Sequence, residues 1–306
     1  MRAPGLKLPS RKNAAAPNAA TVRRDAERAA GMLPAIMVQA DRVATTVAQG
    51  VHGRRRVGQG DSFWQFRRTQ PGDPAHSVDW RQSAKSRFTF VRENEWDAAQ
   101  SVWIWRDTSA SMNYRSTADL PEKQNRVAVL ALALASLLVR GGEQVALLGS
   151  GLPPSNGRAV INRIADHIAL ETEPGPSLPD LEPLPRHGRV VLFGDMLSPV
   201  DDIGTIVRGF AARGVAGHIV QVLDPAEETL PFRGRIRFEG MEGEGDALIG
   251  RVEMVRDDYA ALMRAHRKAL SDVAGSHGWS FATHHTDHPP ESALAALHQY
   301  LSELVD

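Results

Sequence analysis

The chain has 306 residues, enough for one large or two modest domains, and carries 36 Lys plus Arg against 36 Asp plus Glu. This zero formal net charge argues against a dedicated nucleic-acid-binding protein and against bulk attraction to anionic membranes. The absence of cysteine excludes disulfides, thiolate zinc sites and a cysteine nucleophile, and it fits a reducing compartment.

Hydropathy predicts no membrane span. The longest apolar segment, Val127–Val139, is rich in Ala and Leu, is bounded by Arg126 and Arg140, and falls short of the roughly 18 apolar residues that a span requires. It is typical of a helix buried against a sheet. The basic N-terminal residues are followed by no apolar stretch, so we expect no secretory signal and a cytoplasmic protein.

The N-terminal third divides into three segments of different composition. Residues 1–20 contain Ala, Pro and basic residues without periodicity and are predicted to be a disordered tail. Residues 21–49 have a loose helical period broken near Pro34, which predicts a helical segment. Residues 50–100 are rich in Gly, Arg and aromatics, and the alternation over 87–92 predicts a strand in a small β-rich subdomain.

Residues 101–306 alternate between strand and helix patterns. The expected strands are Ser101–Arg106, Gln144–Gly149, Arg189–Gly194, Gly217–Leu223 and Trp279–Thr283. The expected helices are Lys123–Val139, Arg158–Leu170, Asp201–Arg213, Arg256–Ala274 and Glu291–Leu304. This alternation predicts an α/β fold with a doubly wound, mostly parallel sheet.

Two segments of this region depart from the alternation. Glu171–Arg186 interleaves prolines with acidic residues and is predicted to be a surface linker. Residues 232–255 alternate on both sides of the Gly- and Glu-rich stretch 239–245, which predicts a β-hairpin.

Asp107, Ser109 and Ser111 follow directly after the apolar strand that ends at Arg106. One carboxylate and two hydroxyls on alternate residues form an all-oxygen group of the kind that Mg²⁺ prefers. The alternative is an ordinary turn and helix cap, in which Asp and Ser are the common residues.

A second carboxylate is predicted at the same edge of the sheet. Asp195 follows the buried-type strand Arg189–Gly194, and the carboxyl ends of parallel strands meet at one edge, where ligands bind in such sheets. Asp195 is therefore a candidate metal ligand, direct or through water. The alternative is that it caps the turn before Asp201.

These motifs resemble known families. The order Asp107-x-Ser109-x-Ser111 resembles the metal-ion-dependent adhesion site of von Willebrand factor A (vWA) domains. Pro71-Gly72-Asp73, followed by Val78-Asp-Trp-Arg-Gln-Ser-Ala-Lys85, resembles the bacterial domain-of-unknown-function family fifty-eight, over roughly residues 30–300. That resemblance implies a vWA-like fold, working with a MoxR-type AAA+ ATPase as its partner.

The resemblance also implies a metal set. Asp107, Ser109, Ser111 and Asp195 match the vWA positions for Mg²⁺, with Mn²⁺ or Ca²⁺ as alternatives. Two positions depart from the vWA pattern, because Gly194 stands where a hydroxyl precedes the second aspartate, and Thr172 is the nearest candidate for the threonine of an intervening loop. Arg106 adjoins Asp107 and would oppose a cation if it pointed at the site.

Three further groups have sequence patterns that fit either a functional or an ordinary structural role. Asp79, Trp80 and Arg81 are expected to lie in an extended segment, with the two charged residues on one face and Trp80 packed on the opposite side. The basic groups 54–56 and 67–68 are expected to be a solvated or docking face rather than a nucleic-acid site. The histidines of 284–288 are expected to lie in a surface loop rather than bind a transition metal.

The sequence therefore predicts a divalent-cation-dependent interaction module and not an enzyme, because phosphate-loop, zinc-protease and nucleophile-elbow motifs are missing. Two alternatives remain open. One is a metal-dependent hydrolase that uses Asp107 and Asp195. The other is a metal-free scaffold that docks through residues 50–100.

Overall fold

The structure is a computed structural model of the 306-residue chain, and it describes residues 34–49, 63–69, 78, 80–94, 101–171, 173–243 and 245–303. The predicted tail 1–20, the basic residues 54–56, the Pro71-Gly72-Asp73 motif and Thr172 lie outside the described residues.

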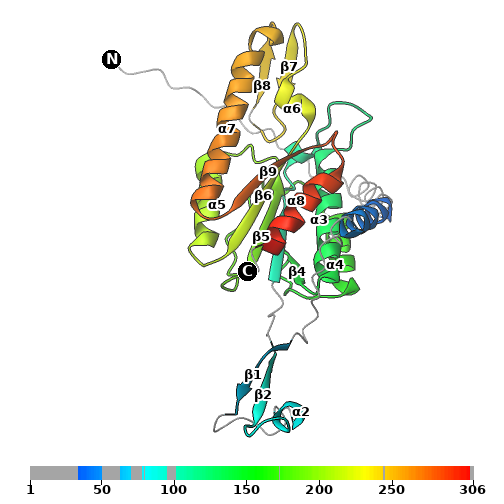
Figure 1. Cartoon of the computed structure of the whole chain (residues 1–306). Helices are drawn as coiled ribbons and strands as arrows, with labels where there is room; N and C mark the ends of the chain where they lie inside the picture. Colours follow the sequence, from blue (N-terminus) through cyan, green and yellow to red (C-terminus); the bar gives the residue numbers. More distant parts are fainter. Residues whose placement is uncertain are drawn as a thin grey trace.

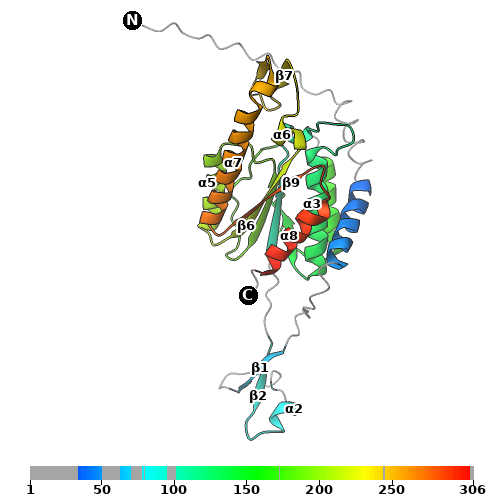
Figure 2. The same cartoon turned by 45° about the horizontal axis from the view of Figure 1, so that its top comes forward.

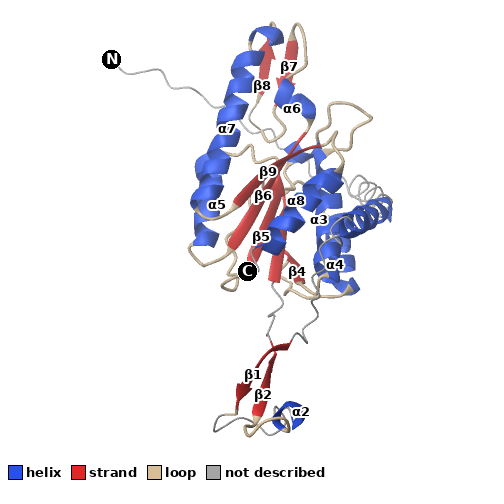
Figure 3. Cartoon of the chain, in the orientation of Figure 1, coloured by secondary structure: helices blue, strands red, loops and turns tan. Residues whose placement is uncertain are grey.

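A five-stranded parallel sheet forms the centre of the molecule (Figure 3). Its strands lie in the spatial order β4-β3-β5-β6-β9, and every neighbouring pair is parallel. The strands are β3 (Ser101–Arg106), β4 (Gln144–Leu147), β5 (Arg189–Gly194), β6 (Ala216–Leu223) and β9 (Ser280–His285). The predicted doubly wound α/β fold is confirmed.

Helices cover both faces of this sheet (Figures 1 and 2). On one face lie α3 (Lys123–Arg140), α4 (Arg158–Leu170) and α8 (Pro290–Glu303), and on the other lie α5 (Val200–Ala211) and α7 (Arg256–Ser276). Short turns complete the layers: η2 (Ala110–Asn113), α6 (Pro225–Thr229) and η3 (Val252–Met254). Because helices pack on both sides of the sheet, both faces of each central strand are buried.

The period-2 geometry of β3 divides the core into two clusters. Val102 and Ile104 face α3, whereas Trp103 and Trp105 face α5 and α7, and all four side chains are buried. This explains why the strand is a continuous apolar run. At its last residue the run stops, because β3 reaches the carboxyl edge of the sheet.

Helix α3 is buried on nearly all sides because it lies between the sheet and the helix at 34–49. Val43, Ala44 and Val47 of that N-terminal helix belong to the same core cluster as α3. At its far end, Arg140 forms an ion pair with Asp41 at 2.5 Å. Despite its apolar character, neither α3 nor any other described helix is long and apolar enough to cross a bilayer.

Two hairpins stand outside the central sheet. The predicted hairpin in 232–255 is confirmed as β7 (Ile236–Glu239) paired with β8 (Asp246–Ile249), and its turn is directed toward the carboxyl edge of the sheet (Figure 1). The second pairs β1 (Phe63–Arg68) with β2 (Phe90–Asn94).

The expectation for Trp80 was wrong. Trp80 begins the short helix α2 (Trp80–Ser83) instead of lying packed in an extended segment, and it is 68% exposed. The Ala84 amide closes this turn on the Trp80 carbonyl at 3.0 Å, and the Ser83 hydroxyl accepts from the Phe90 amide at 2.9 Å. These local hydrogen bonds fold the segment back on β2.

Candidate metal centre

The sheet order places the candidate site at a topological switch point. From β3 the chain moves first to one neighbour, β4, and then to the other side, to β5. Ligands bind in such sheets where the winding reverses, beyond the carboxyl ends of the two strands concerned. Asp107 follows β3 and Asp195 follows β5, and the Asp107 amide donates to the Phe193 carbonyl at 2.7 Å. The two aspartates therefore begin adjacent loops.

Asp107 is a buried carboxylate that is incompletely satisfied. Its side chain is 1% exposed, and Oδ1 accepts a hydrogen bond from the Ser109 amide at 2.8 Å. Its Oδ2 is buried and has no hydrogen-bond partner among the described residues. Burial, and then the neighbouring Asp195 carboxylate, raises the pKa of Asp107 to about 7. A cation beside Oδ2 would relieve both effects.

The two serines complete the group. The 3₁₀ turn η2 brings the Ser109 and Ser111 hydroxyl oxygens to 3.1 Å from each other. Ser111 Oγ donates to Asp195 Oδ2 at 2.6 Å. The structure thus brings together all four residues that the sequence singled out, in one contiguous set of oxygens. We name Asp107, Ser109, Ser111 and Asp195 the rim.

Sequence reasoning missed Lys123, which is the cation of this site. Lys123 is the first residue of α3 and is fully buried, and its Nζ lies 2.9 Å from Asp195 Oδ2 and 2.6 Å from Glu227 Oε1. Burial by itself would lower the pKa of Lys123, but the two carboxylates outweigh it and raise the pKa, so the ammonium stays charged. One feature of the sequence could have indicated this role. A basic residue in the first turn of a helix is unfavourable beside the positive end of the helix dipole, so it suggests a nearby carboxylate.

A second row of polar groups holds Glu227 in place. Asp224 and Glu227 form a capping box at the start of α6, in which Glu227 Oε2 accepts from the Asp224 amide at 2.8 Å. Asp224 Oδ2 also accepts from the Ser116 amide at 2.8 Å, which ties the loop after η2 to α6. The Asp-Pro-Ala-Glu pattern of 224–227 could have revealed the cap, but not its proximity to Asp195.

The structure accounts for the glycine at 194 and for the charge of Arg106. A β-carbon on Gly194 would lie 2.8 Å from Asp107 Cβ and 2.9 Å from Asp107 Oδ2, so a side chain at 194 has no room. The positive charge of Arg106 is paired, because its guanidinium forms an ion pair with the carboxylate of Glu171. Burial lowers the pKa of Arg106 to about 10, and Asp107 partly opposes that shift.

Two loops approach the rim. The proline-rich linker comes close at Gly175, whose amide donates to the Thr108 carbonyl at 2.9 Å, and the hydroxyls of Ser177 and Ser198 lie 3.2 Å apart. From the β7–β8 hairpin, Glu242 Oε1 lies 3.4 Å from the Ser111 amide nitrogen. Glu242 also contributes to the raised pKa of Asp107, so its carboxylate acts electrostatically on the rim.

The rim residues fit a hard divalent cation. Their side chains present only oxygen donors, and Asp107 Oδ2 is a buried acceptor with no partner in the part of the chain that the structure describes. In that same part, no cluster of three or more His, Cys, Asp or Glu side chains is arranged to hold a metal. The rim differs from such a cluster because two of its four donors are hydroxyls. Mg²⁺ sites with few carboxylates and several waters have this composition.

The histidines at 284–288 occupy a different position from the one expected. His284 and His285 lie within β9, and only His288 lies in the turn after it, so the expectation of a surface loop was wrong for the first two. His285 pairs with Glu228, and His284 is buried. Arg126 donates to the carbonyls of Thr286 and His288 at 2.7 and 3.0 Å, which fixes the turn. These contacts hold the end of β9 and its turn in place, and the described residues here do not form a metal site.

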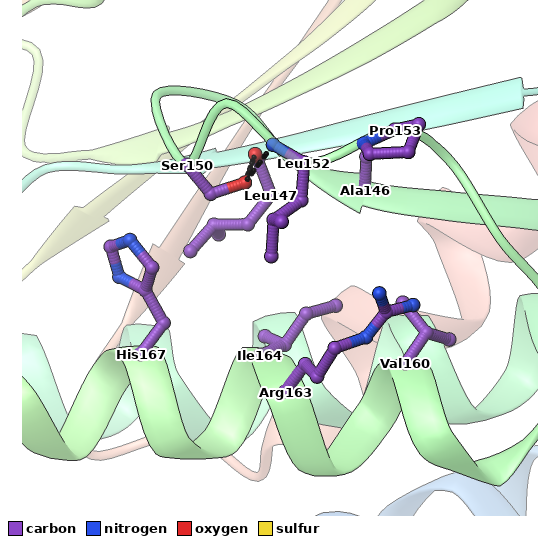
Figure 4. A pocket seen from close by; sticks show the side chains of 9 residues that line it. All are labelled: Ala146, Leu147, Ser150, Leu152, Pro153, Val160, Arg163, Ile164 and His167. Atoms are coloured by element: carbon purple, nitrogen blue, oxygen red, sulfur yellow. Dashed lines mark hydrogen bonds between the residues drawn. The ribbon is translucent and has the colours of Figure 1, made fainter.

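A small pocket lies elsewhere on the domain, between the end of β4 and α4 (Figure 4). Leu152 and Ile164 face each other across it, with Arg163 and His167 on the α4 side. No rim residue lines it, so the pocket is not part of the candidate metal centre.

Comparison with known families decides the identity of the chain. The sequence profile described as "Protein of unknown function DUF58" matches residues 65–269. The chain belongs to the DUF58 family. This confirms the resemblance drawn from the Pro-Gly-Asp and Asp-Trp-Arg motifs. The matched range includes most of the β1–β2 hairpin, the whole rim and most of α7.

This DUF58 protein is similar to relatives in mycobacteria. It is 28% identical over 243 residues to Uncharacterized protein Mb1516 of Mycobacterium bovis and to Uncharacterized protein Rv1480 of Mycobacterium tuberculosis, covering 74% of each chain in both cases.

Two solved structures from Bacteroides are similar at a lower level. One is an aerotolerance-related membrane protein from Bacteroides fragilis, with 16% identity, a TM-score of 0.41 and coverage of 67% of this chain and 99% of that chain. The other is the conserved hypothetical protein BatB from Bacteroides thetaiotaomicron, with 15% identity, a TM-score of 0.40 and coverage of 67% and 98%.

Proposed function

We propose that this DUF58 protein is a vWA-like interaction module whose rim binds a partner protein through a divalent cation. The observation that carries the proposal is the buried Oδ2 of Asp107, which no described residue hydrogen-bonds, beside two serine hydroxyls and a second aspartate at the switch point of the sheet. A buried acceptor without a partner costs free energy, and such groups cluster at functional sites.

In this proposal the rim residues have distinct roles. Asp107, Ser109 and Ser111 would hold Mg²⁺, with Mn²⁺ or Ca²⁺ as alternatives, and Asp195 would support the ion directly or through water. The ion supplies a Lewis-acidic position that accepts an oxygen ligand. The carboxylate of a partner's acidic side chain is the ligand of matching charge. Metal binding and partner capture are then linked, because each stabilises the other.

The partner that we propose is a MoxR-type AAA+ ATPase, and the compartment is the cytoplasm. Two observations support this partner: the chain belongs to the DUF58 family, and the oxygen donors of the rim suit a cation that binds another protein. The support for the compartment is the absence of cysteine. The proposed role is non-enzymatic, as an adaptor in the assembly or maturation of other proteins.

A binding experiment with matched variants tests the proposal. Wild type should retain the purified ATPase in Mg²⁺ and release it in EDTA, whereas Asp107→Asn should fail to retain it in either buffer. Asp166→Asn, at an exposed position on α4, is the matched control and should behave as wild type. If Asp107→Asn retains the ATPase as well as wild type does, the proposal is wrong.

A second measurement tests the cation alone. At 100-fold excess over its dissociation constant, Mg²⁺ should stabilise wild type by about 2.7 kcal/mol, or roughly 5–10 °C in melting temperature. Asp107→Asn should show no such shift. Turnover of a phosphodiester or peptide that disappears in Asp195→Asn would instead favour the hydrolase alternative.

A further inference from the structure

Lys123 has contacts that its place in the fold does not require. Its side chain is fully buried at the start of a helix whose other buried positions are apolar except for Arg126 and Ser136. Burying an ammonium costs free energy unless carboxylates compensate it. The Lys123 amide donates to the Tyr114 carbonyl, and the ammonium has no acceptor with which to cap the other amides of the first turn. A methionine of similar length would fill the same space.

The position of the ammonium relative to the rim is specific. Lys123 Nζ and Ser111 Oγ both donate to the same atom, Asp195 Oδ2, at 2.9 and 2.6 Å. The other oxygen, Oδ1, accepts from the Leu197 amide at 3.1 Å. The ammonium and any cation held by the rim therefore share the charge of one carboxylate.

Glu227 gives the ammonium a second and independent anchor. It lies 2.6 Å from Lys123 Nζ and is itself fixed by the Asp224 amide. Lys123 can therefore keep one full ion pair when the charge of Asp195 is claimed by another cation. An ammonium with a single carboxylate would not have this option.

We propose that Lys123 is a built-in counter-cation that holds Asp195 in the cation-free site and thereby sets the affinity of the rim for a divalent ion. The inference rests on the proposed function and deepens it, since it names the residue that regulates cation loading. Lys123 is a positioning residue here, because it acts on the ion through Asp195. Its charge repels the ion, so the site is tuned to bind weakly and reversibly.

A purely structural role for Lys123 makes a different prediction. If the ammonium only joined α3 to β5 and α6, its removal would lower the melting temperature and leave the affinity for Mg²⁺ unchanged or reduced. If it competes with the ion, its removal must raise that affinity. Affinity for Mg²⁺ alone therefore separates the two roles.

The test measures Mg²⁺ binding to the full chain by calorimetry, and melting temperature in Mg²⁺ and in EDTA. Lys123→Met should bind Mg²⁺ about tenfold more tightly than wild type, because the variant removes the repulsion between the ammonium and the ion across their shared carboxylate. Lys123→Arg keeps the charge and should bind as wild type. Lys268→Met removes an exposed ammonium paired with Asp272 on α7 and is the matched control.

Lys123→Met leaves Asp195 and Glu227 without their cation, so its fold is at risk. The double variant Lys123→Met with Glu227→Gln restores the net charge of the trio, and glutamine can still accept from the Asp224 amide. It should fold and should still bind Mg²⁺ more tightly than wild type, since Asp195 is free of the ammonium. If only the net charge of the trio mattered, the double variant would bind Mg²⁺ with the same affinity as wild type.

The outcomes separate the inference from the function on which it rests. Tighter binding in the variants that lack the ammonium, with binding in wild type, supports both. Mg²⁺ binding in these variants that is equal to or weaker than binding in wild type overturns the role of Lys123 and leaves the cation site standing. Binding in these variants but none in wild type supports the role of Lys123 and overturns cation dependence in the native protein. No binding in any of them overturns both.

Discussion

Replacing Gly194 with alanine tests whether the tight approach of β5 to Asp107 shapes the site. The added methyl would meet Asp107 Cβ at 2.8 Å and Asp107 Oδ2 at 2.9 Å, whereas non-bonded carbons rest at about 3.5–4.0 Å. Asp107 has little freedom to move away, because its amide is bonded to Phe193 and its Oδ1 to the Ser109 amide. One of these interactions must weaken.

The expected cost follows from this geometry. Inserting a methyl into a packed, buried position typically costs about 1–3 kcal/mol. For a domain of roughly 150–250 residues, each kcal/mol corresponds to a fall of about 2–4 °C in melting temperature. The variant should also lose Mg²⁺-dependent stabilisation, because Asp107 is displaced from the serines.

Chemical and thermal unfolding in EDTA and in Mg²⁺ provide the assay. Gly275→Ala is the matched control, because Gly275 lies in α7 and an added β-carbon there meets nothing within 4 Å. The control should be stabilised by up to about 1 kcal/mol through helix propensity. If Gly194→Ala is as stable as wild type, the close approach does not constrain the site and the explanation of the glycine is wrong.

Two further predictions concern pH and the hairpin. Burial lowers the pKa of His218 to about 4 and of His284 to about 3, so each stays neutral in the fold while the unfolded chain takes up a proton near pH 6.5. Their contribution to stability is complete above about pH 6.5 and is lost as the pH falls toward those values, at about 2 kcal/mol each by pH 5. In urea unfolding, His218→Gln should lose less stability than wild type or the exposed control His187→Asn between about pH 7 and pH 5, and an equal loss would contradict this. Glu242→Gln should weaken Mg²⁺ binding up to about fivefold at low salt, because an exposed carboxylate beside the rim attracts the ion; unchanged affinity would show that the hairpin does not act on the site.

The order of strands and helices could be read from the sequence because hydrophobic periodicity is local. The strand β3 and the strand β5 have the predicted bounds, and α4 does as well. Each is a short segment in which apolar side chains follow the pattern expected for a buried strand or recur with the period of a helix. The prediction for Trp80 was wrong because a single turn of helix, closed by the Ala84 amide on the Trp80 carbonyl, leaves little periodic signal in the sequence.

The sequence by itself also brought Asp107, Ser109, Ser111 and Asp195 to one edge, since the carboxyl ends of parallel strands must meet there. Lys123, Glu227 and Glu242 could not be assigned to it. Lys123 lies 72 positions before Asp195 and 104 before Glu227, and their meeting depends on how α3 and α6 pack on the sheet. Strand order fixes which loops are neighbours, but only the packing of helices decides which charges those loops share.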